Sequence, residues 1–500
     1  LLLLESYLDI GWIGIALYAG IAVFLFGVAW TPQLLNQWIA RRLLRNEPMS
    51  GKQQVRIIEW IHFHPLKKLL VFGLWGFGVV LVLRGIWVTA TGKIEMDGEL
   101  FLFLLGTAVL VVALFQKMGL SIVLAAPTGR AAKRMRELTG MEAQTVHRLL
   151  SMSWNEATHQ VTFQKTEKEP LEAEAVIVDE MSMVDVKLFQ ALLAAARYHC
   201  RIIMVGDADQ LPSVGAGNIL SEVIRSGCVP TVCLNEIFRQ AKRSLIVENA
   251  HHIISGEPLQ KGSKTDDFFF LEADGEAAQR LVCDLVTTRL PRSYGFDPIR
   301  DIQVLCPTKL GPTGTQALNV ELQNLLNPPQ KGKPQLQSAA RVFRVGDKVM
   351  QVRNNYEIVW NRIGGEQGVG AYNGDIGIVE SINLRERSMV VRMDDRRLLY
   401  PAENLNELEI AYAITVHKSQ GSEFPAVILP VAQVPPRLCY RNLFYTGVTR
   451  ARRLCVVAGR RDVVNSMMSN IRQNLRYSGL CALLQAGQPS EQLSTEGESP

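Results

Sequence analysis

The chain has 500 residues, of which 48% are hydrophobic and 20% are charged, and its formal net charge is +5. This length predicts two to four domains, and so small a positive charge permits nucleic-acid binding without arguing for it. Eight cysteines without a C-x-x-C pair favour reduced thiols in a cytosolic compartment over a disulfide framework.

The first 120 residues contain three apolar stretches. Residues 10–30 and 69–90 reach the ~20 apolar residues that a bilayer span takes, and 101–115 is shorter. The Lys- and Arg-rich loop of residues 31–68 lies in the cytoplasm by the positive-inside rule. We therefore expect an all-α membrane segment with about three spans, which anchors a cytoplasmic remainder to the inner membrane. Three buried core helices are the alternative, which the lack of a polar face disfavours.

Residues 121–135 (SIVLAAPTGRAAKRM) predict an apolar strand, a Pro127-Thr128-Gly129 turn and a basic helix that begins near Arg130. The free N–H groups at such a helix start suit a backbone phosphate. His147, in TVHRLL, is a further candidate for a phosphate contact, or otherwise a packed helix residue. Residues 154–170 have no helical stripe and predict a small exposed hairpin.

The most specific element is the apolar run that ends in two acids, Asp179 and Glu180. A continuous apolar run suits a strand covered on both faces, and open α/β sheets bind ligands at the carboxyl ends of their strands. Asp179 can hold Mg²⁺ and Glu180 can polarise an attacking water, as phosphoryl transfer requires. Helix capping is the alternative role for such a pair.

The next predicted strand, residues 201–206, runs into Asp207, Asp209 and Gln210. An amide in this position can sense a γ-phosphate. Arg239 is a candidate arginine finger, which would neutralise charge in the transition state. Alternatively, Arg239 forms a surface salt bridge.

The second half repeats this pattern. Residues 301–309 predict a strand that feeds a polar turn, and residues 342–399 predict a small β-barrel insert in which Asn373-Gly374 indicates a hairpin. Residues 413–424 then carry His417, Lys418 and Glu423 ahead of another apolar strand. The polar tail of residues 481–500 is predicted to be disordered.

Residues 121–480 resemble the RecD/TraA-like branch of superfamily 1 DNA helicases. Seven motifs carry the resemblance in order: APTGRAAKRM, TVHRLL, VDEMSMVD, GDADQLPSVGAGN, NEIFRQ, TVHKSQGSEF and YTGVTRARR. The resemblance implies an α/β fold with two RecA-like parallel-sheet domains and an SH3-like insert. We expect the first domain at residues 121–295, the second at 296–341 and 401–480, and the insert at 342–400.

The resemblance also implies the cofactors ATP and Mg²⁺, single-stranded DNA or duplex ends as partners, and 5′ to 3′ movement. Asp179 and Glu180 would act at Mg²⁺ and the hydrolytic water, and the hairpin would be the strand-separating pin. The expected residues at the γ-phosphate are Gln210, Arg239 and Arg450. The expected nucleotide contacts are Asp207, Gly421 and Glu423, the last of them at the ribose. The expected DNA contacts are Pro127, Thr128, Gly129, Arg130, His147, Thr308, His417 and Lys418.

One family motif is missing: no G-x-x-x-x-G-K-[ST] phosphate loop occurs in the sequence. Three hypotheses remain open. The chain is a DNA helicase truncated or mis-joined at about residue 120, or a membrane-tethered nucleic-acid-binding protein without ATPase activity, or a membrane protein with a structural C-terminal part. The full set of polar motif residues argues against the third.

Overall fold

The computed structural model describes residues 119–155, 160–233, 244–260, 262–263, 266–338, 341–362, 365–471 and 478–487, together with Phe115 and Arg476. The predicted membrane spans at residues 10–30 and 69–90, and nearly all of the one at 101–115, lie outside these residues. Among the residues described, no helix combines the length and the apolar character needed to cross a bilayer.

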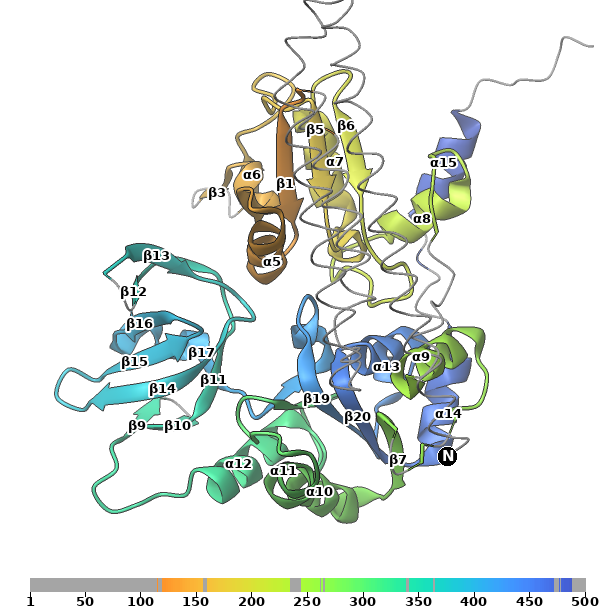
Figure 1. The fold of residues 1–500 in the computed structure, drawn as a ribbon. Helices are drawn as coiled ribbons and strands as arrows, with labels where there is room; N and C mark the ends of the chain where they lie inside the picture. Colours follow the sequence, from red (N-terminus) through yellow and green to blue (C-terminus); the bar gives the residue numbers. More distant parts are fainter. Residues whose placement is uncertain are drawn as a thin grey trace, which may run out of the picture. The chain divides into compact units, whose positions relative to one another are not determined.

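The first lobe is built on a parallel sheet with the strand order β2-β1-β5-β6, and β1, β5 and β6 run side by side in Figure 1. Its strands are β1 (Ile122–Ala126), β2 (Ala143–Thr145), β5 (Ala175–Val178) and β6 (Arg201–Met204). Its helices are α5 (Gly129–Thr139), α6 (Val146–Leu149), α7 (Val186–Ala195) and α8 (Ile219–Ser226). All four residues of β5 are buried, as expected of a strand covered on both faces.

The predicted hairpin is present but begins and ends earlier than expected. Its strands are β3 (Met152–Asn155) and β4 (Gln160–Phe163), which pair antiparallel. Residues 164–170 form no strand. The predicted range of 154–170 was therefore wrong at both ends: Met152 and Ser153 belong to the first strand, and residues 164–169 (QKTEKE) are all polar and do not continue the alternation.

The second lobe has a five-stranded sheet in the order β18-β8-β19-β20-β7, whose neighbouring strands are all parallel. Its strands are β7 (Phe268–Glu272), β8 (Ile302–Cys306), β18 (Ala413–Thr415), β19 (Phe424–Val431) and β20 (Ala451–Gly459). Its helices include α9 (Leu245–Ser255), α10 (Gly275–Asp284), α11 (Leu290–Tyr294), α12 (Thr315–Leu326), α13 (Arg441–Val448) and α14 (Arg461–Ser469).

The predicted boundary between the lobes at residue 295 is wrong. Strand β7 pairs along its whole length with β20, so residues 268–272 belong to the second sheet. Phe268 is fully buried in the core of that lobe, together with Leu305 and Val427. The first lobe therefore ends before Phe268.

An antiparallel insert, in which the described residues form nine strands, interrupts the second lobe. Its main sheet has the order β13-β12-β16-β15-β14-β11-β17, and β9 and β10 form a separate hairpin. The strands are β9 (Gln335–Ser338), β10 (Arg341–Arg344), β11 (Lys348–Gln351), β12 (Asn355–Arg362), β13 (Gln367–Ala371), β14 (Ile376–Asn383), β15 (Ser388–Met393), β16 (Arg396–Tyr400) and β17 (Leu408–Ile410). The predicted β-rich insert is thus present, although it extends beyond residues 342–400 on both sides.

The turn at Asn373-Gly374 is tight but does not make a hairpin. Gly374 has a φ of +96°, which glycine adopts readily. The strands on either side of the turn pair elsewhere, because β13 pairs with β12 whereas β14 pairs with β11 and β15. The turn therefore connects strands that are not neighbours in the sheet, and the hairpin prediction at this position was wrong.

Asp347 anchors the insert to the second lobe. Its fully buried carboxylate accepts hydrogen bonds from Gln323, Asn327 and Tyr412 side chains and from the backbone N–H of Arg344, at 2.6–3.0 Å. Two of these donors lie on or just after α12, so the insert is joined to the lobe by buried polar contacts as well as by the chain.

The end of the described chain returns to the first lobe. Helix α15 (Leu480–Ala486) packs on α8, where Leu480 and Leu484 join the core of that lobe. Ser478 bonds to Glu222, and Arg476 donates to the backbone oxygens of Gly215 and Gly217 at 2.6 and 2.9 Å. The prediction of a tail disordered from residue 481 was therefore wrong for residues 481–486 (CALLQA), which are mostly apolar and form most of α15.

Candidate nucleotide and nucleic-acid site

Asp179 and Glu180 stand at the carboxyl end of β5, as predicted. Glu180 has a φ of +53°, a left-handed conformation that is strained for a residue with a side chain. Two backbone contacts hold the turn: the N–H of Glu180 donates to Asp179 Oδ1 at 2.8 Å, and the N–H of Met181 donates to Val205 O. The strand therefore ends in a fixed turn that presents two carboxylates.

Burial makes these carboxylates hard to ionise. It raises the pKa of Asp179 above its ordinary value, although the N–H of Glu180 and the charge of Arg134 oppose the rise. The pKa of Glu180 rises from 4.5 to about 7, chiefly because its carboxyl is enclosed, with the charges of Asp179 and Asp207 adding to the effect. Arg450 is the strongest opposing charge. Glu180 can thus exchange a proton near neutral pH, as a general base requires.

The segment after β6 lies between the two lobes. Asp207 Oδ2 accepts hydrogen bonds from Gln210 Nε2 at 3.3 Å and from the hydroxyl of Tyr445, on α13 of the second lobe, at 2.8 Å. The carboxamide oxygen of Gln210 is buried and has no hydrogen-bond partner in the structure. We call residues 207–217 the sensor segment.

Side chains of the second lobe also hold the backbone of the sensor segment. Asn442 Nδ2 donates to Asp209 O at 2.7 Å, and Gln420 Nε2 donates to Leu211 O at 3.0 Å. The N–H of Leu211 donates to Thr446 Oγ1 at 2.9 Å. A shift of the sensor segment would therefore disturb the packing between the lobes.

Arg450 is buried and is held by backbone oxygens, with Nε 3.3 Å from Thr446 O and Nη1 3.3 Å from Ser422 O. Its charge lowers the pKa of Glu180. Arg239, the other candidate at the γ-phosphate, lies outside the described residues.

Glu423 is paired with two arginines from different lobes. Its Oε2 lies 3.1 Å from Arg134 Nη2 of α5 and 2.7 Å from Arg452 Nε of β20. Burial alone would raise the pKa of Glu423, but these arginines hold it below its ordinary value. The predicted contact with a ribose stays a prediction, and the same carboxylate bridges the lobes here.

The predicted DNA contacts of the first lobe lie around the start of α5. Thr128 caps this helix by accepting from the N–H of Ala131 at 3.2 Å. Gly421 approaches from the second lobe so closely that a Cβ added there would lie 3.3 Å from Thr128 Oγ1. Arg130 is turned away from this point, because its Nη1 donates to Gly374 O of the insert at 3.4 Å.

Pro127 and His147 line one pocket of about 180 Å³. The sensor segment supplies Ser213, Val214 and Gly215 to the same pocket, and the second lobe supplies Gln420. Burial lowers the pKa of His147, and the charge of Asp185, also in the lining, opposes that shift. The pocket therefore joins predicted DNA contacts to the segment that holds Gln210.

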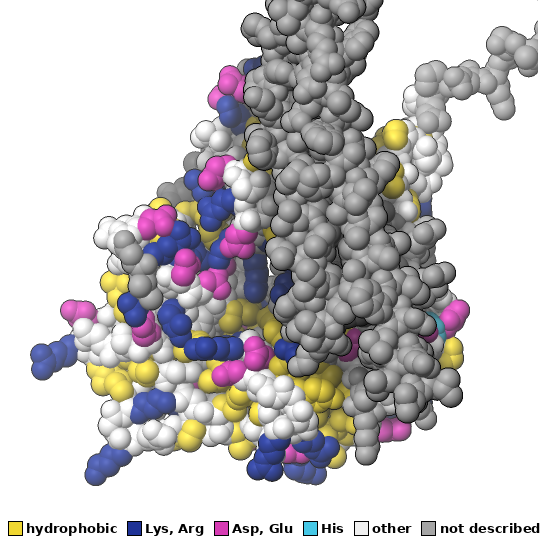
Figure 2. All heavy atoms as spheres, viewed as in Figure 1, with side chains coloured by type: hydrophobic (Ala, Val, Ile, Leu, Met, Phe, Trp, Pro, Cys, Tyr) yellow, Lys and Arg dark blue, Asp and Glu magenta, His cyan; other side chains and the backbone are white. Residues whose placement is uncertain are grey.

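The remaining candidates belong to the second lobe. The Oγ1 of Thr308 accepts from the N–H of Leu310 at 3.3 Å. His417 Nε2 lies 3.4 Å from the Tyr440 hydroxyl, and burial lowers the pKa of this histidine. Lys418 Nζ pairs with Glu409 at 2.6 Å. On the face drawn in Figure 2, basic and acidic side chains are mixed outside the grey region.

The acidic groups suit a magnesium ion that arrives with a nucleotide. Burial and the nearby Asp207 raise the pKa of Asp209, as they do that of Glu180. No group of three or more His, Cys, Asp or Glu in the described ranges is placed to hold a metal. Mg²⁺ commonly takes one or two carboxylates and completes its shell with water and phosphate oxygens.

Sequence reasoning missed the contacts that join the lobes. Tyr445 lies inside a quoted motif and Asn442 just before it, yet only the fold brings them to the sensor segment. Arg134 and Gln420 also lay inside quoted motifs without an assigned role. Spacing within α5 could have indicated that Arg130 and Arg134, four residues apart, share one face of the helix.

Three protein-family models match the chain in order. They are an AAA domain at residues 106–216, an ATP-dependent RecD-like DNA helicase SH3 domain at 318–393, and a UvrD-like helicase C-terminal domain at 410–458. The first match begins inside residues 101–115, which we predicted to span a membrane. The match therefore does not support a membrane span at these residues.

Two curated proteins are similar over most of the chain. The ATP-dependent RecD2 DNA helicase of Deinococcus radiodurans is 36% identical over 339 residues, which cover 68% of this chain and 43% of that protein. The RecBCD enzyme subunit RecD of Mycobacterium tuberculosis is 30% identical over 398 residues, which cover 73% of this chain and 64% of that protein. The chain thus spans less than two thirds of the length of either.

A solved structure of Bacteroides Pif1 bound to single-stranded DNA is similar at 19% identity and a TM-score of 0.39. The match covers 73% of this chain and 86% of that one.

Proposed function

We propose that this chain, which is similar to the RecD-like superfamily 1 helicases in sequence and in the order of its three domain matches, is the motor region of an ATP-dependent 5′ to 3′ DNA helicase. The observation that carries the proposal is the sensor segment. It begins at the strand next to the acid pair, and side chains of the other lobe hold it. A change at a bound nucleotide would therefore alter the contact between the lobes.

Each group of the site has a defined part in this proposal. Asp179 holds Mg²⁺, which when bound neutralises charge on the phosphates. Glu180 takes a proton from the attacking water, for which a pKa of about 7 is suitable. Gln210 offers its unpartnered carboxamide oxygen to that water, and Arg450 stabilises negative charge that develops during transfer.

The DNA strand is proposed to run past the start of α5 and the pocket that Pro127 and His147 line, toward Thr308, His417 and Lys418. The partner is single-stranded DNA or a duplex end, with the β3–β4 hairpin as the element that separates strands. The close approach of Gly421 to Thr128 supports this path, because it brings the two lobes together beside the first of these residues.

The sequence has no phosphate loop, so the test has two stages. In the first, the chain itself is titrated with a fluorescent single-stranded oligonucleotide, and binding is expected. The proposal would be refuted if the folded chain did not bind at low salt and no single substitution near the proposed DNA site restored binding.

In the second stage, a G-x-x-x-x-G-K-[ST] loop is installed ahead of Ser121, and displacement of a strand from 5′-tailed and 3′-tailed duplexes is compared. ATP-dependent displacement is expected with the 5′ tail only. Glu180→Gln in the same background should abolish ATP hydrolysis and leave ATP binding nearly unchanged, because Gln keeps the shape but cannot accept the proton. Hydrolysis at the parent rate would show that Glu180 is a structural cap.

A further inference from the structure

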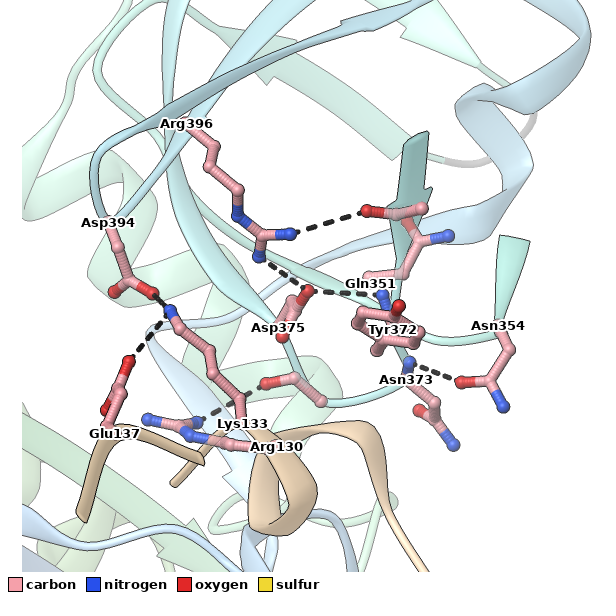
Figure 3. A network of polar contacts seen from close by, with 12 residues as sticks. Arg130, Lys133, Glu137, Gln351, Asn354, Tyr372, Asn373, Asp375, Asp394 and Arg396 are labelled. Carbon is pink, nitrogen blue, oxygen red and sulfur yellow. Dashed lines mark hydrogen bonds and ion pairs between the residues drawn. The ribbon is translucent and has the colours of Figure 1, made fainter. Parts of the chain in front are cut away.

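The β insert touches the helix that begins the proposed DNA path. Figure 3 shows Arg130 and Lys133 on α5 facing a turn of the insert and Asp394. Arg130 Nη1 donates to Gly374 O at 3.4 Å, and Lys133 Nζ forms an ion pair with Asp394. Lys133 also lies 3.8 Å from Glu137 on its own helix. Both cationic side chains are thus engaged by groups of the protein itself.

The contact is closely packed at its centre. A Cβ added to Gly129 would lie 2.6 Å from the ring of Tyr372, so the insert covers the first turn of α5. Burial lowers the pKa of Arg130, and the charges of Asp375 and Asp394 oppose that shift. The guanidinium carbon also lies 5.9 Å from the centre of the Phe424 ring. Arg130 is therefore half-buried between the insert and the second lobe, with its Nη1 bonded to the insert.

Asp375 and Asp394, two acids of the insert, pair with cations in different parts of the molecule. Asp375 is buried and pairs at 3.1 Å with Arg396, which belongs to the insert. Asp394 occupies the two-residue turn between β15 and β16, and its ion pair is with Lys133 of α5. The side chain of Asp394 is largely exposed, so its partial enclosure raises its pKa only against stronger opposition: the bond and charge of Lys133, with the charges of Arg130 and Arg396, hold the pKa below its ordinary value. The charged form of Asp394 is thus stabilised by cations that include Lys133 and Arg130 of α5.

We propose that this contact is a latch in which Asp394 and the Gly374 carbonyl occupy Arg130 and Lys133 in place of the phosphates of a single DNA strand. The inference rests on the proposed function, because it concerns regulation of the same DNA site. Docking of the insert on α5 and phosphate binding by α5 then exclude each other. The ligand that opens the latch is a phosphodiester backbone, whose charge replaces that of Asp394.

The neighbouring residue provides a matched control. Asp395 lies in the same turn and pairs with Arg362 Nε at 2.9 Å, entirely within the insert. The side chains of Asp394 and Asp395 are 65% and 60% exposed, so Asp394→Asn and Asp395→Asn remove the same charge from similar surroundings. Only the first substitution releases Lys133, so any general effect of net charge appears equally in both variants.

The experiment measures binding of the full chain to a fluorescein-labelled oligothymidylate by anisotropy, at low and high salt, after melting curves confirm that each variant is folded. Asp394→Asn should tighten the apparent Kd about three- to fivefold, the size expected for release of one partly exposed ion pair. Asp395→Asn should change it by less than about twofold. Carbodiimide coupling of Lys133 to Asp394, read by peptide mapping of the parent chain, should fall when the oligonucleotide is added.

Each outcome decides one of the two proposals. If the parent binds and Asp394→Asn binds no more tightly than Asp395→Asn, the latch is refuted and the proposed function stands. If neither the parent nor Asp394→Asn binds at low salt, the proposed function is refuted and the latch has no ligand. Binding by Asp394→Asn alone would support both.

Discussion

The enclosed carboxyl of Glu180 predicts that a neutral side chain at this position stabilises the nucleotide-free protein above pH 7. In the unfolded chain a glutamate ionises near 4.5, whereas in the folded chain the pKa of Glu180 is about 7. Between these values the unfolded state releases a proton that the folded state retains. Stability is therefore lost as the pH rises from 4.5 to about 7, and the loss is constant at higher pH.

The size of this effect follows from the shift in pKa. A rise from 4.5 to about 7 corresponds to at most ~3 kcal/mol. Glu180→Gln avoids ionisation but still buries an amide, which has its own cost. We therefore expect the variant to be more stable than the parent by ~2 kcal/mol at pH 8 and no more stable at pH 4.5.

Urea denaturation at a series of pH values, in EDTA to remove divalent cations, measures this difference as a change in the unfolding midpoint. Glu142→Gln at an exposed position is the control for loss of a glutamate carboxyl in general. A variant that is less stable than the parent at pH 8, or a difference that does not change with pH, would refute the reasoning about burial.

Three further predictions concern catalysis, binding and the insert. Because the sequence lacks a phosphate loop, its DNA-stimulated ATP turnover should lie far below the ~10 s⁻¹ typical of enzymes, and a coupled assay that finds such a rate would contradict this. The affinity for single-stranded DNA should fall with salt with a logarithmic slope of ~−0.7 per phosphate contacted, so equal affinity at low and high salt would exclude phosphate contacts. Asp347→Ala removes the acceptor of four hydrogen bonds and should cost several kcal/mol in urea denaturation, whereas Tyr412→Phe removes one donor and should cost ~1–2 kcal/mol. A cost below ~1 kcal/mol for Asp347→Ala would show that these bonds do not hold the insert.

Much of the core could be predicted from sequence because parallel strands covered on both faces need unbroken apolar runs. The runs of β5 and β19 satisfy this rule and are buried almost throughout. The position of Asp179 and Glu180 follows from the same rule, since ligands meet open sheets at the carboxyl ends of strands. These inferences depend only on the order of apolar and charged residues within one short segment, which can be read from the sequence.

What could not be predicted depends on which distant segments pair. The run Phe268–Glu272 is plainly a strand, but nothing in it indicates that its partner is β20. Asn373-Gly374 is plainly a turn, but whether the adjoining strands pair with each other is decided by the whole sheet. The enclosure of Arg130 likewise depends on an insert that begins some two hundred residues later in the chain.

The return of α15 to the first lobe has a consequence for how the chain folds. Ser478 and Glu222, which join there, are 256 residues apart in sequence. At ~5–20 residues per second, a ribosome would take some tens of seconds to make the stretch between them. Throughout that time the apolar side of α8 that receives Leu480 and Leu484 is open, although most of the first lobe has been synthesised. Contacts between residues so far apart in sequence also form slowly, because a long loop must close first. We therefore expect the first lobe to reach its final packing last, after the lobe that follows it.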